Sequence, residues 1–340
     1  MNIAVCFNLA PAVPLRGEQQ DRISEAGAEV EAEAVAAALT LLGHTPTLVP
    51  LGAKITPFVC VLQKLQPQLV FNLCEGFWGQ SSRELHIAAL LDLLGLAHTG
   101  SPALTLGLTQ NKALTKDLLV RHNLPTPDYL LIQPGESLPE KLPEKMASSW
   151  PLIVKPYLED ASIGIGAESV VSDMGALRSR VAYIHTRYHQ GALVEEFIAG
   201  REFNAAVIGD GSLEALPISE ICFQTGLERQ IVSYAGKWLE DSAEYVATEP
   251  VCPAPLVLEE EETLQAAALQ ACRLLGCRDY ARVDIRMRDG IPYILEVNAN
   301  PDISPSAGFA RAACAAGLDY PALIDRILKL CLTRMENTNA

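Results

Sequence analysis

The sequence lacks several features that would each point to a particular class of protein. No apolar run approaches the roughly 18 residues that a membrane-spanning helix needs. No basic segment precedes the apolar start Met1-Asn2-Ile3-Ala4-Val5, which is typical of a first strand and not of a signal peptide. None of the nine cysteines forms a Cys-x-x-Cys pair. We therefore expect no membrane partner, reduced and mostly buried thiols, and a cytoplasmic location.

Positive charge is also scarce. The chain has 26 Lys and Arg against 41 Asp and Glu, a formal net charge of −15, and no basic cluster interrupts it. This field would repel a polyanion, so we exclude nucleic acid as a partner. It would also repel ATP, so a nucleotide site would need local lysines and a metal ion. No Walker Gly-x-x-x-x-Gly-Lys-Ser/Thr motif is present to supply such a site.

The composition that remains is that of an ordinary folded protein. Of the 340 residues, 49% are hydrophobic and 20% charged, which favours two or three domains. Across residues 1–108, short apolar runs alternate with helix-forming segments that end at glycines, which predicts an open, mainly parallel α/β domain. Residues 109–190 have the pattern of a small α+β module. Residues 191–340 are strand-rich, apart from a polar, irregular stretch at 224–249.

The most informative stretch is residues 281–298, which has the pattern of a β-hairpin around Asp289-Gly290. Because side chains alternate along a strand, one sheet face receives most of the polar residues. This face holds Arg282, Asp284 and Arg286 from the first strand, and Ile294, Glu296 and Asn298 from the second. Two carboxylates and an amide oxygen close together suit Mg²⁺, and Arg282 beside the metal could hold an oxyanion. On this stretch alone, a solvated face of alternating charge is an equally good interpretation.

The metal hypothesis makes a geometric demand on the hairpin. A two-residue turn at Asp289-Gly290 would pair Glu296 with Val283, on the wrong face. A three-residue loop with Gly290 at positive φ would pair Glu296 with Asp284. We predict the three-residue loop, with Leu295 among the residues that cover the core. Asp284 and Glu296 on opposite faces would rule the metal site out.

Two other segments carry weaker signals. Lys155 ends an apolar strand and precedes the small-residue loop 161–166, where a lysine can meet phosphate. Glu195 and Glu196 lie on a strand end whose backbone groups and carboxylates would suit an adenine edge and a ribose. In isolation, a plain acidic strand end is the more ordinary interpretation.

Taken in order along nearly the whole chain, six segments resemble the motifs of the ATP-grasp superfamily, and within it the D-alanine–D-alanine ligases. Residues 94–101 resemble Leu-Gly-x-x-x-Thr-Gly-Ser, Asn111-Lys112 resembles an Asp-Lys helix start, and residues 152–156 resemble Val-Ile-Val-Lys-Pro. Residues 195–203 follow Glu-x-x-x-x-Gly-x-Glu-Phe, and the two hairpin strands are similar to Gly-Arg-Ile-Asp and Leu-Glu-x-Asn-x-x-Pro. The resemblance implies an α/β and α+β multidomain ATP-grasp fold behind an N-terminal, Rossmann-like domain.

The resemblance also implies a role for each matching residue. The residues implied to contact ATP are Lys112, Lys155, Ser162, Ile163, Gly164, Glu195, Glu196, Ile198, Glu202 and Lys237. The residues implied to hold Mg²⁺, or Mn²⁺ in its place, are Asp284, Glu296 and Asn298. Arg282, Lys237 and Ser162 would act on the reacting groups. The implied reaction is the ATP-dependent joining of a carboxylate to an amine through an acylphosphate, with amino-acid-like molecules as substrates.

The departures from the family pattern lie where substrates would bind. The family's histidine is missing around Glu75, its loop serine falls on Ala161, and its tyrosine falls on Trp238. Its glycine after the last Pro falls on Asp302, and its carboxylate-binding serine falls on Ala307. Asp302 near the amine-side pocket would disfavour a carboxylate and favour a cationic or polyamine-like group.

The expected substrate residues are therefore Glu75, Asp302, Ala307 and Glu29, the last as a loose match to the family's N-terminal glutamate. We expect a ligase that is not an efficient D-alanine–D-alanine ligase. The alternatives are a genuine D-alanine–D-alanine ligase, a phosphotransferase that stops at a phosphorylated product, and an ATP-binding regulatory protein without ligase activity. A homodimer would follow the habit of the family.

Overall fold

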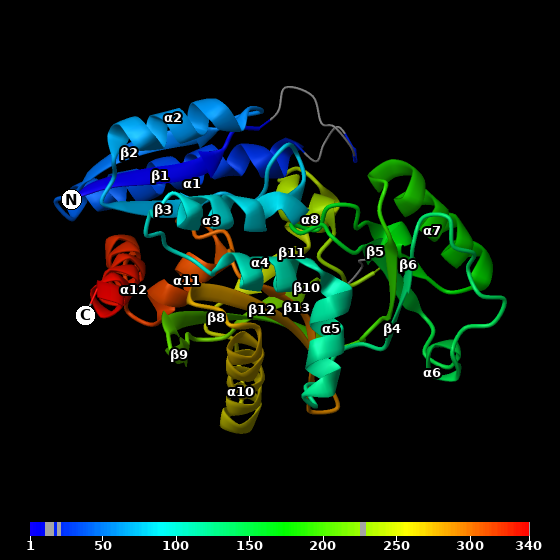
Figure 1. Cartoon of the computed structure of the whole chain (residues 1–340). Coiled ribbons are helices and arrows are strands. Elements are labelled where there is room, and N and C mark those ends of the chain that lie inside the picture. Colours follow the sequence, from blue (N-terminus) through cyan, green and yellow to red (C-terminus); the bar gives the residue numbers. More distant parts are fainter. Residues whose placement is uncertain (11–16, 19–21, 225–228, 340) are drawn as a thin grey trace.

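The N-terminal unit is built on a parallel sheet whose strands follow the order β2-β1-β3 (Figure 1). The computed structural model describes residues 1–10, 17–18, 22–224 and 229–339. Alternate residues of β1 face opposite ways: Ile3 and Val5 join the core on the side of α1, while Ala4 and Cys6 join the core under α2 and α3. Burial on both faces is expected of a parallel sheet covered by helices. The elements are β1 (Asn2–Asn8), α1 (Arg22–Leu41), β2 (Thr45–Leu51), α2 (Ile55–Leu65), β3 (Leu69–Leu73), a 3-10 turn (Ser81–Arg83) and α3 (Glu84–Leu93).

The central unit is an antiparallel sheet in the order β4-β7-β5-β6, covered by α7. Leu177 and Ile184 of α7 pack on Val154 and Val194 of the sheet. Because β7 pairs with β4 and β5, this unit continues past the predicted boundary at residue 190. The elements are β4 (Tyr129–Ile132), α6 (Glu144–Ala147), β5 (Leu152–Pro156), a 3-10 turn (Ala167–Ser169), β6 (Val170–Val171), α7 (Met174–Tyr188) and β7 (Ala192–Glu196).

The C-terminal unit contains the sheet β11-β10-β8-β12-β13, with β9 paired to β8. Helices α10, α4 and α5 pack on one of its faces, where Leu264, Leu106 and Leu119 share a core with β12 and β13. The stretch predicted to be irregular contains α8, α9 and β11. The elements are α4 (Ala103–Gln110), α5 (Lys112–Arg121), β8 (Arg201–Asp210), β9 (Ser212–Ala215), β10 (Ser219–Phe223), α8 (Tyr234–Trp238), α9 (Ala243–Val246), β11 (Thr248–Val251), α10 (Leu258–Leu275), β12 (Asp279–Arg288) and β13 (Ile291–Asn298).

The last two helices tie the end of the chain to its beginning. α11 (Gly308–Ala315) and α12 (Tyr320–Asn339) share a core with α1 and β1, in which Ile324 and Ile327 lie with Val35 and Leu39. Figure 1 shows the red α12 beside the blue N-terminal sheet. Among the helices of the described residues, none is long and apolar enough to cross a membrane. The predicted α/β and α+β multidomain fold class is confirmed.

The hairpin β12–β13 reaches the predicted pairing by a different route. Asp289 and Gly290 form a two-residue turn with φ of 54° and 75°, so Arg288 pairs directly with Ile291. The predicted three-residue loop is therefore wrong. A bulge at Leu295 shifts the register by one residue, so Glu296 still pairs with Asp284.

The bulge also reverses two side chains of the predicted pattern. Ile294, expected on the polar face, is fully buried in the core, whereas Leu295, expected in the core, lines a cavity. The extra residue lets the apolar and polar faces each continue beyond the bulge, which keeps Glu296 on the polar face.

Candidate active site

The polar face of β12 and β13 forms the centre of the candidate site. Arg282 donates from Nε and Nη2 to the two oxygens of Asp284, at 2.7 and 2.9 Å. Asn204 of β8 donates to the same carboxylate at 2.7 Å. Arg282 is opposite Asn298, and Asp284 is opposite Glu296, so the four predicted residues lie together.

Lys112, at the start of α5, joins this face from a distant part of the sequence. Asn111 caps the helix by accepting a hydrogen bond from the Leu114 amide. This cap fixes where α5 begins and places Lys112 at its first position. The Lys112 ammonium lies 2.8 Å from Asp160 and 3.2 Å from Glu296. Burial alone would lower the pKa of Lys112, but Asp160 and Glu296 raise it above its ordinary value. Burial would likewise raise the pKa of Glu296, but Lys112, Lys155 and Arg282 lower it, so this carboxylate is ionised.

The donor set of this face fits Mg²⁺. Asp284, Glu296 and Asn298 offer hard oxygen ligands, and Mg²⁺ in such sites takes one or two carboxylates and completes its shell with phosphates and water. In the described part of the chain, no group of three or more His, Cys, Asp and Glu side chains could hold a metal alone.

A second ion cluster lies deeper, beneath the strand ends of the central sheet. Glu195 is 1% exposed and stands between Lys155, at 2.8 Å, and Lys116, at 3.0 Å. Lys116 also donates a hydrogen bond to Oγ1 of Thr126 at 2.9 Å, so its ammonium group contacts both Thr126 and Glu195. Burial lowers the pKa of Lys116 to about 8, although Glu195 opposes the shift. The glutamate thus holds Lys155 at the cavity edge.

Arg286 organises the remaining residues expected to contact a nucleotide. It donates from Nε and Nη2 to Glu202, at 2.9 and 2.6 Å, and from Nη1 to the Ile198 carbonyl at 2.9 Å. Glu196 is bound separately, by Arg288 at 2.6 Å. Burial raises the pKa of Glu202, and Arg286 opposes that shift.

The loop after β5 is tied to α8 by two hydrogen bonds. The Trp238 indole donates to the Ala161 carbonyl, and the Tyr234 amide donates to the Ile165 carbonyl, both at 2.9 Å. Gly164 has φ of +72°, and a Cβ there would lie 2.8 Å from Pro156, so glycine is required. α8 also carries Lys237, whose ammonium lies 5.2 Å from the centroid of the Trp238 ring. Burial and Arg282 both lower the pKa of Lys237.

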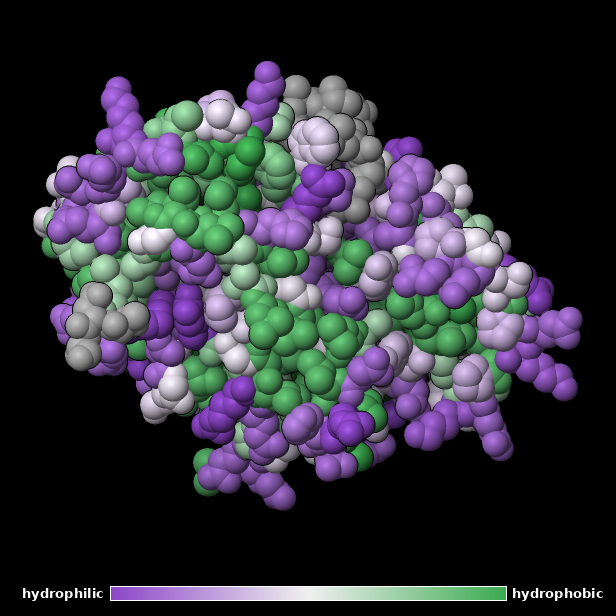
Figure 2. Space-filling view, viewed as in Figure 1, coloured by the Kyte–Doolittle hydropathy of each residue, from purple (hydrophilic) through white to green (hydrophobic). Residues whose placement is uncertain are grey.

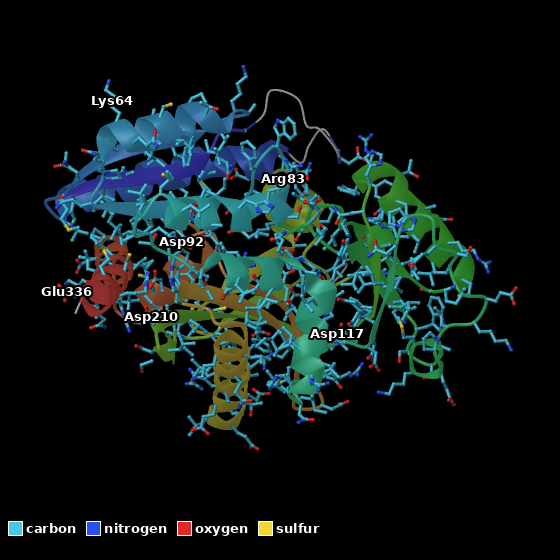
Figure 3. The ribbon with its side chains drawn as sticks, in the orientation of Figure 1. Lys64, Arg83, Asp92, Asp117, Asp210 and Glu336 are labelled. Carbon is cyan, nitrogen blue, oxygen red and sulfur yellow. The ribbon has the colours of Figure 1, made fainter. Side chains whose placement is uncertain are left out.

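Two cavities meet at this centre. The larger, about 810 Å³, is lined by Lys155, Ser162, Asp284, Glu296 and other polar residues, and the smaller, about 450 Å³, is lined by α1 and by the segment after β3. The residues that line both cavities are Ala161, Lys237, Trp238, Arg282 and Asp302. Arg83, labelled in Figure 3, lies with its guanidinium 5.2 Å from the ring centroid of Trp78, which lines the smaller cavity.

The expected substrate residues divide among these places. Glu75 and Asp302 line the smaller cavity, and Ala307 lines the larger one. Glu29 does not fit its expected role, because it is exposed on α1 and lines neither cavity. Glu31, two residues further along the same helix, is buried and lines the smaller cavity.

Several residues of the site escaped the sequence-based prediction. They are Glu31, Glu84, Glu159, Asp160, Asn204 and Asn300, together with the ion-pairing part played by Lys116. Asn300 lies within the matched Leu-Glu-x-Asn-x-x-Pro segment, and its proximity to Asn298 was the one available signal.

The fold and this arrangement of lysines, carboxylates and a glycine-containing loop define an ATP-grasp ligase. A family model described as "D-ala D-ala ligase C-terminus" matches residues 118–329. The chain is 35% identical over 315 residues to y4sG of Sinorhizobium fredii, described as uncharacterized, covering 89% of this chain and 88% of that protein. It is 32% identical to a D-alanine–D-alanine ligase of Desulforamulus reducens, covering 78% and 81%. A D-alanine–D-alanine ligase of Bacillus anthracis complexed with ATP matches over 100% of both chains, with a TM-score of 0.76 and 25% identity.

The chain belongs to the D-alanine–D-alanine ligase family. It is therefore a D-alanine–D-alanine ligase-like, ATP-dependent carbon–nitrogen ligase, and the resemblance described from its motifs is confirmed.

Proposed function

We propose that this chain joins the carboxylate of one amino-acid-like substrate to the amine of another, with ATP bound in the larger cavity and the amine substrate in the smaller. The observation that carries the proposal is the meeting of the two cavities at Lys237, Arg282 and Asp302. Lys237 could bind phosphate, Arg282 could hold an oxyanion and Asp302 could face a substrate, and all three residues line both cavities. Phosphoryl transfer needs such positioned charge more than it needs covalent help from the protein.

ATP would lie along the larger cavity with its phosphates toward the junction. Lys155, Glu195, Glu196, Ile198 and Glu202 line this cavity. Glu195 and Glu196 with the Ile198 backbone would bind the adenine, and Glu202 the ribose. Lys112, Lys155 and Lys237 would bind phosphate, and Ser162, Ile163 and Gly164 would close over it.

Asp284, Glu296 and Asn298 would hold Mg²⁺, with Mn²⁺ as a substitute, and the metal when bound would neutralise phosphate charge. Lys112 and Arg282 balance the carboxylates of this face in the structure. Arrival of a cation and of phosphates together would therefore keep the site close to its present charge.

The reaction would proceed in two displacements. The oxygen of one carboxylate forms a bond to the γ-phosphorus as the bond to ADP breaks. The amine nitrogen then bonds to the acyl carbon, and phosphate leaves with the electrons of the C–O bond. Arg282 would stabilise the oxyanion of the tetrahedral intermediate, which forms when the amine adds to the acyl carbon and collapses when phosphate leaves. The attacking amine must first lose a proton, and Glu75, a solvent-accessible carboxylate in the lining of the smaller cavity, can accept it. Desolvation within the cavity and repulsion from Asp302 raise the pKa of Glu75 to about 7.

Protection of the acylphosphate from water would be the task of the loop after β5. The Trp238 indole holds this loop at Ala161, and both residues line the junction. Closure of the loop over bound phosphates would exclude water while the amine attacks.

The test is an ADP-release screen over pools of carboxylates and amines, with identification of the amide product. We expect ADP, phosphate and an amide with at least one pool. Glu296→Gln is the inactive control, with an expected loss of about 100-fold or more because it removes a metal ligand and a partner of Lys112. Glu214→Gln, at an exposed carboxylate that pairs with Arg326, is the matched control with activity retained. Mg²⁺-dependent ATP binding without ADP release from any pool would favour the regulatory protein instead.

D-alanine–D-alanine ligation is the second candidate, supported by the names of the relatives. We expect it to be inefficient, because Asp302 and Glu75 place two carboxylates in the smaller cavity, where they would repel the carboxylate of an incoming amino acid. Robust ADP release with D-alanine alone at millimolar concentration would refute this expectation.

A cytoplasmic location and a homodimer complete the proposal. Figure 2 shows apolar surface over α2 and over α4 and α5, and Val61 of α2 and Leu104 of α4 are both exposed. Such surface supports self-association. Light scattering of the purified protein across a concentration series tests the dimer, and a monomer at every concentration would exclude it.

A further inference from the structure

The larger cavity is lined by two polar pairs that join neighbouring strands. β8 and β12 are antiparallel, with Asn204 opposite Asp284 and Glu202 opposite Arg286. All four side chains line the cavity. Because an antiparallel strand rises about 3.4 Å per residue, the second pair lies about 7 Å along the sheet from the first, which contains an expected metal ligand. The sugar and the outer phosphates of a nucleotide are separated by a distance of this order.

Arg286 binds only one of the two carboxylate oxygens of Glu202. Its Nε and Nη2 both donate to Oε2, at 2.9 and 2.6 Å. Among the described residues, none donates a hydrogen bond to Oε1, although this oxygen is not sealed from the cavity. Glu202 as a whole is 8% exposed. Oε1 is therefore the oxygen that remains to accept a hydrogen bond from a molecule bound in the cavity.

The guanidinium of Arg286 is itself held in place from several sides. Nη1 donates to the Ile198 carbonyl at 2.9 Å, and Nη2 also donates to the Gln230 carbonyl. The ring centroids of Phe197 and Phe223 lie 4.8 and 5.8 Å from its Cζ, within the range of cation–π contact. The side chain is buried, at 3% exposure. A planar guanidinium bound in this way has little freedom to move, so it fixes the orientation of the carboxylate that it binds.

The charge of Arg286 also suits Glu202 to bind a hydroxyl group. Burial raises the pKa of Glu202, and the positive charge of Arg286 opposes that shift. An ionised carboxylate accepts hydrogen bonds at both oxygens, and these bonds are stronger than those between neutral groups. With Oε2 bound by the arginine, the remaining oxygen is a directed acceptor for a hydroxyl group.

We propose that Arg286 is a positioning residue for the recognition of ribose: by binding Oε2 of Glu202, it presents Oε1 to a hydroxyl group of the nucleotide's sugar. This inference rests on the proposed function, because it requires ATP in the larger cavity. It adds the residue on which selection of ribonucleotides over deoxyribonucleotides depends. Arg286 acts through Glu202, so its loss should affect the choice of nucleotide more than the rate of the chemical step.

The experiment compares ATP with 2′-deoxy-ATP and 3′-deoxy-ATP. With Mg²⁺ and the carboxylate and amine pools, release of the nucleoside diphosphate is measured for each nucleotide. We expect kcat/KM for ATP to exceed that for at least one analogue by about tenfold or more, because a hydrogen bond to an ionised carboxylate is lost. In Arg286→Met, this preference should fall to about twofold or less, through a higher KM for ATP at a nearly unchanged kcat.

Two further variants separate positioning from a general loss of structure. Glu202→Ala should also abolish the preference, and its combination with Arg286→Met should lower the preference no further, because both changes remove the same interaction. Arg201→Met is the matched control. Arg201 binds both oxygens of Glu220, at 2.7 and 2.8 Å, and its Cζ lies 4.9 Å from the Phe203 ring centroid. Within the described ranges, neither member of this pair lines the larger cavity, so the control should leave the preference unchanged.

Calorimetric binding of the three nucleotides with Mg²⁺, without the other substrates, separates this inference from the proposed function. Equal efficiency for all three nucleotides, or a preference that survives Arg286→Met, would overturn the inference and leave the ligase intact. A binding preference that is lost in Arg286→Met, without diphosphate release from any pool, would sustain the inference and refute the ligase. Absence of both binding and release would refute both. If Arg286→Met fails to fold, Arg286→Lys carries the comparison, since lysine keeps the charge but lacks the planar pair of donors.

Discussion

Glu296 lies opposite Asp284 in the pairing of β12 with β13, although the turn at Asp289-Gly290 would by itself align Glu296 with Val283. The one-residue difference is absorbed by the bulge at Leu295. Ile294 and the bulged Leu295 therefore have unlike surroundings, although they are adjacent in the chain and both are apolar.

Because of the bulge, we expect two neighbouring alanine substitutions to affect different properties, one the stability and the other the binding of ATP. Ile294→Ala should lower the free energy of unfolding by about 3 kcal/mol, because Ile294 is fully buried in the core under α10. Leu295→Ala should cost less than about 1 kcal/mol but raise KM for ATP several-fold, because Leu295 lines the larger cavity. Urea unfolding and ADP-release kinetics measure the two effects, and equal losses of stability would contradict the assignment of faces.

The buried cluster around Glu195 predicts an asymmetry between its members. Glu195→Gln leaves two lysines without a buried anion and should cost about 3–5 kcal/mol. Lys116→Met should cost less, because burial already disfavours the Lys116 ammonium and Glu195 keeps Lys155 as its partner. Chemical denaturation of both variants provides the measurement. A larger loss for Lys116→Met would show that the lysine, and not the glutamate, holds the cluster together.

The raised pKa of Glu75 predicts a pH dependence of stability with a definite sign. Glu75 has a pKa of about 7 in the folded protein against 4.5 ordinarily, so the unfolded chain releases this proton first as the pH rises. Stability should therefore fall between about pH 4.5 and pH 7. In Glu75→Gln, the decrease of Tm from pH 5 to pH 8 should be smaller than in the parent protein. An unchanged decrease would mean that Glu75 titrates normally.

Loss of the hydrogen bond from Trp238 to Ala161 should uncouple ADP release from amide formation. Trp238→Phe keeps a ring beside Lys237 but removes the donor, so the loop after β5 should close less firmly. The expected outcome is a several-fold rise in ADP release without an amine substrate, because water reaches the acylphosphate. Stability should change by only about 1 kcal/mol. Trp150→Phe, in the central unit, is the matched control, and equal uncoupling in both variants would count against the role of this bond.

Local pattern in the sequence was sufficient for the polar face of the hairpin and for the mixed α/β and α+β fold class. The alternation around Asp284, Glu296 and Asn298 marked one face, and the ordered motifs placed Lys112 and Lys155 near it. The bulge could not be predicted from the sequence, because Leu295 is an ordinary strand residue. Its insertion depends on how Ile294 packs under α10. Geometry inferred from turn length alone therefore gave the correct pairing through the wrong loop.

Long-range packing determines the parts of the candidate site that the sequence did not predict. Glu29 and Glu31 are two residues apart on one helix, so they point to nearly opposite sides, and only the seating of α1 on its sheet determines which one meets the cavity. Glu84 and Asn300 form a hydrogen bond across 216 residues of sequence, which depends on the docking of the N-terminal unit onto the C-terminal one. No local periodicity reports such a contact.

In the proposed function, the five residues from Asn298, at the end of β13, to Asp302 would connect the metal site to the substrate cavity. Between them, Asn300 is fixed by Tyr280 at 2.7 Å, by Glu84 at 2.8 Å and by the Cys74 carbonyl at 3.3 Å. Because this amide anchors the middle of the segment, we expect that the side chain at position 302 could be exchanged without displacing Asn298. If the proposed roles hold, single replacements at position 302 would then change the accepted substrate while the metal site is kept.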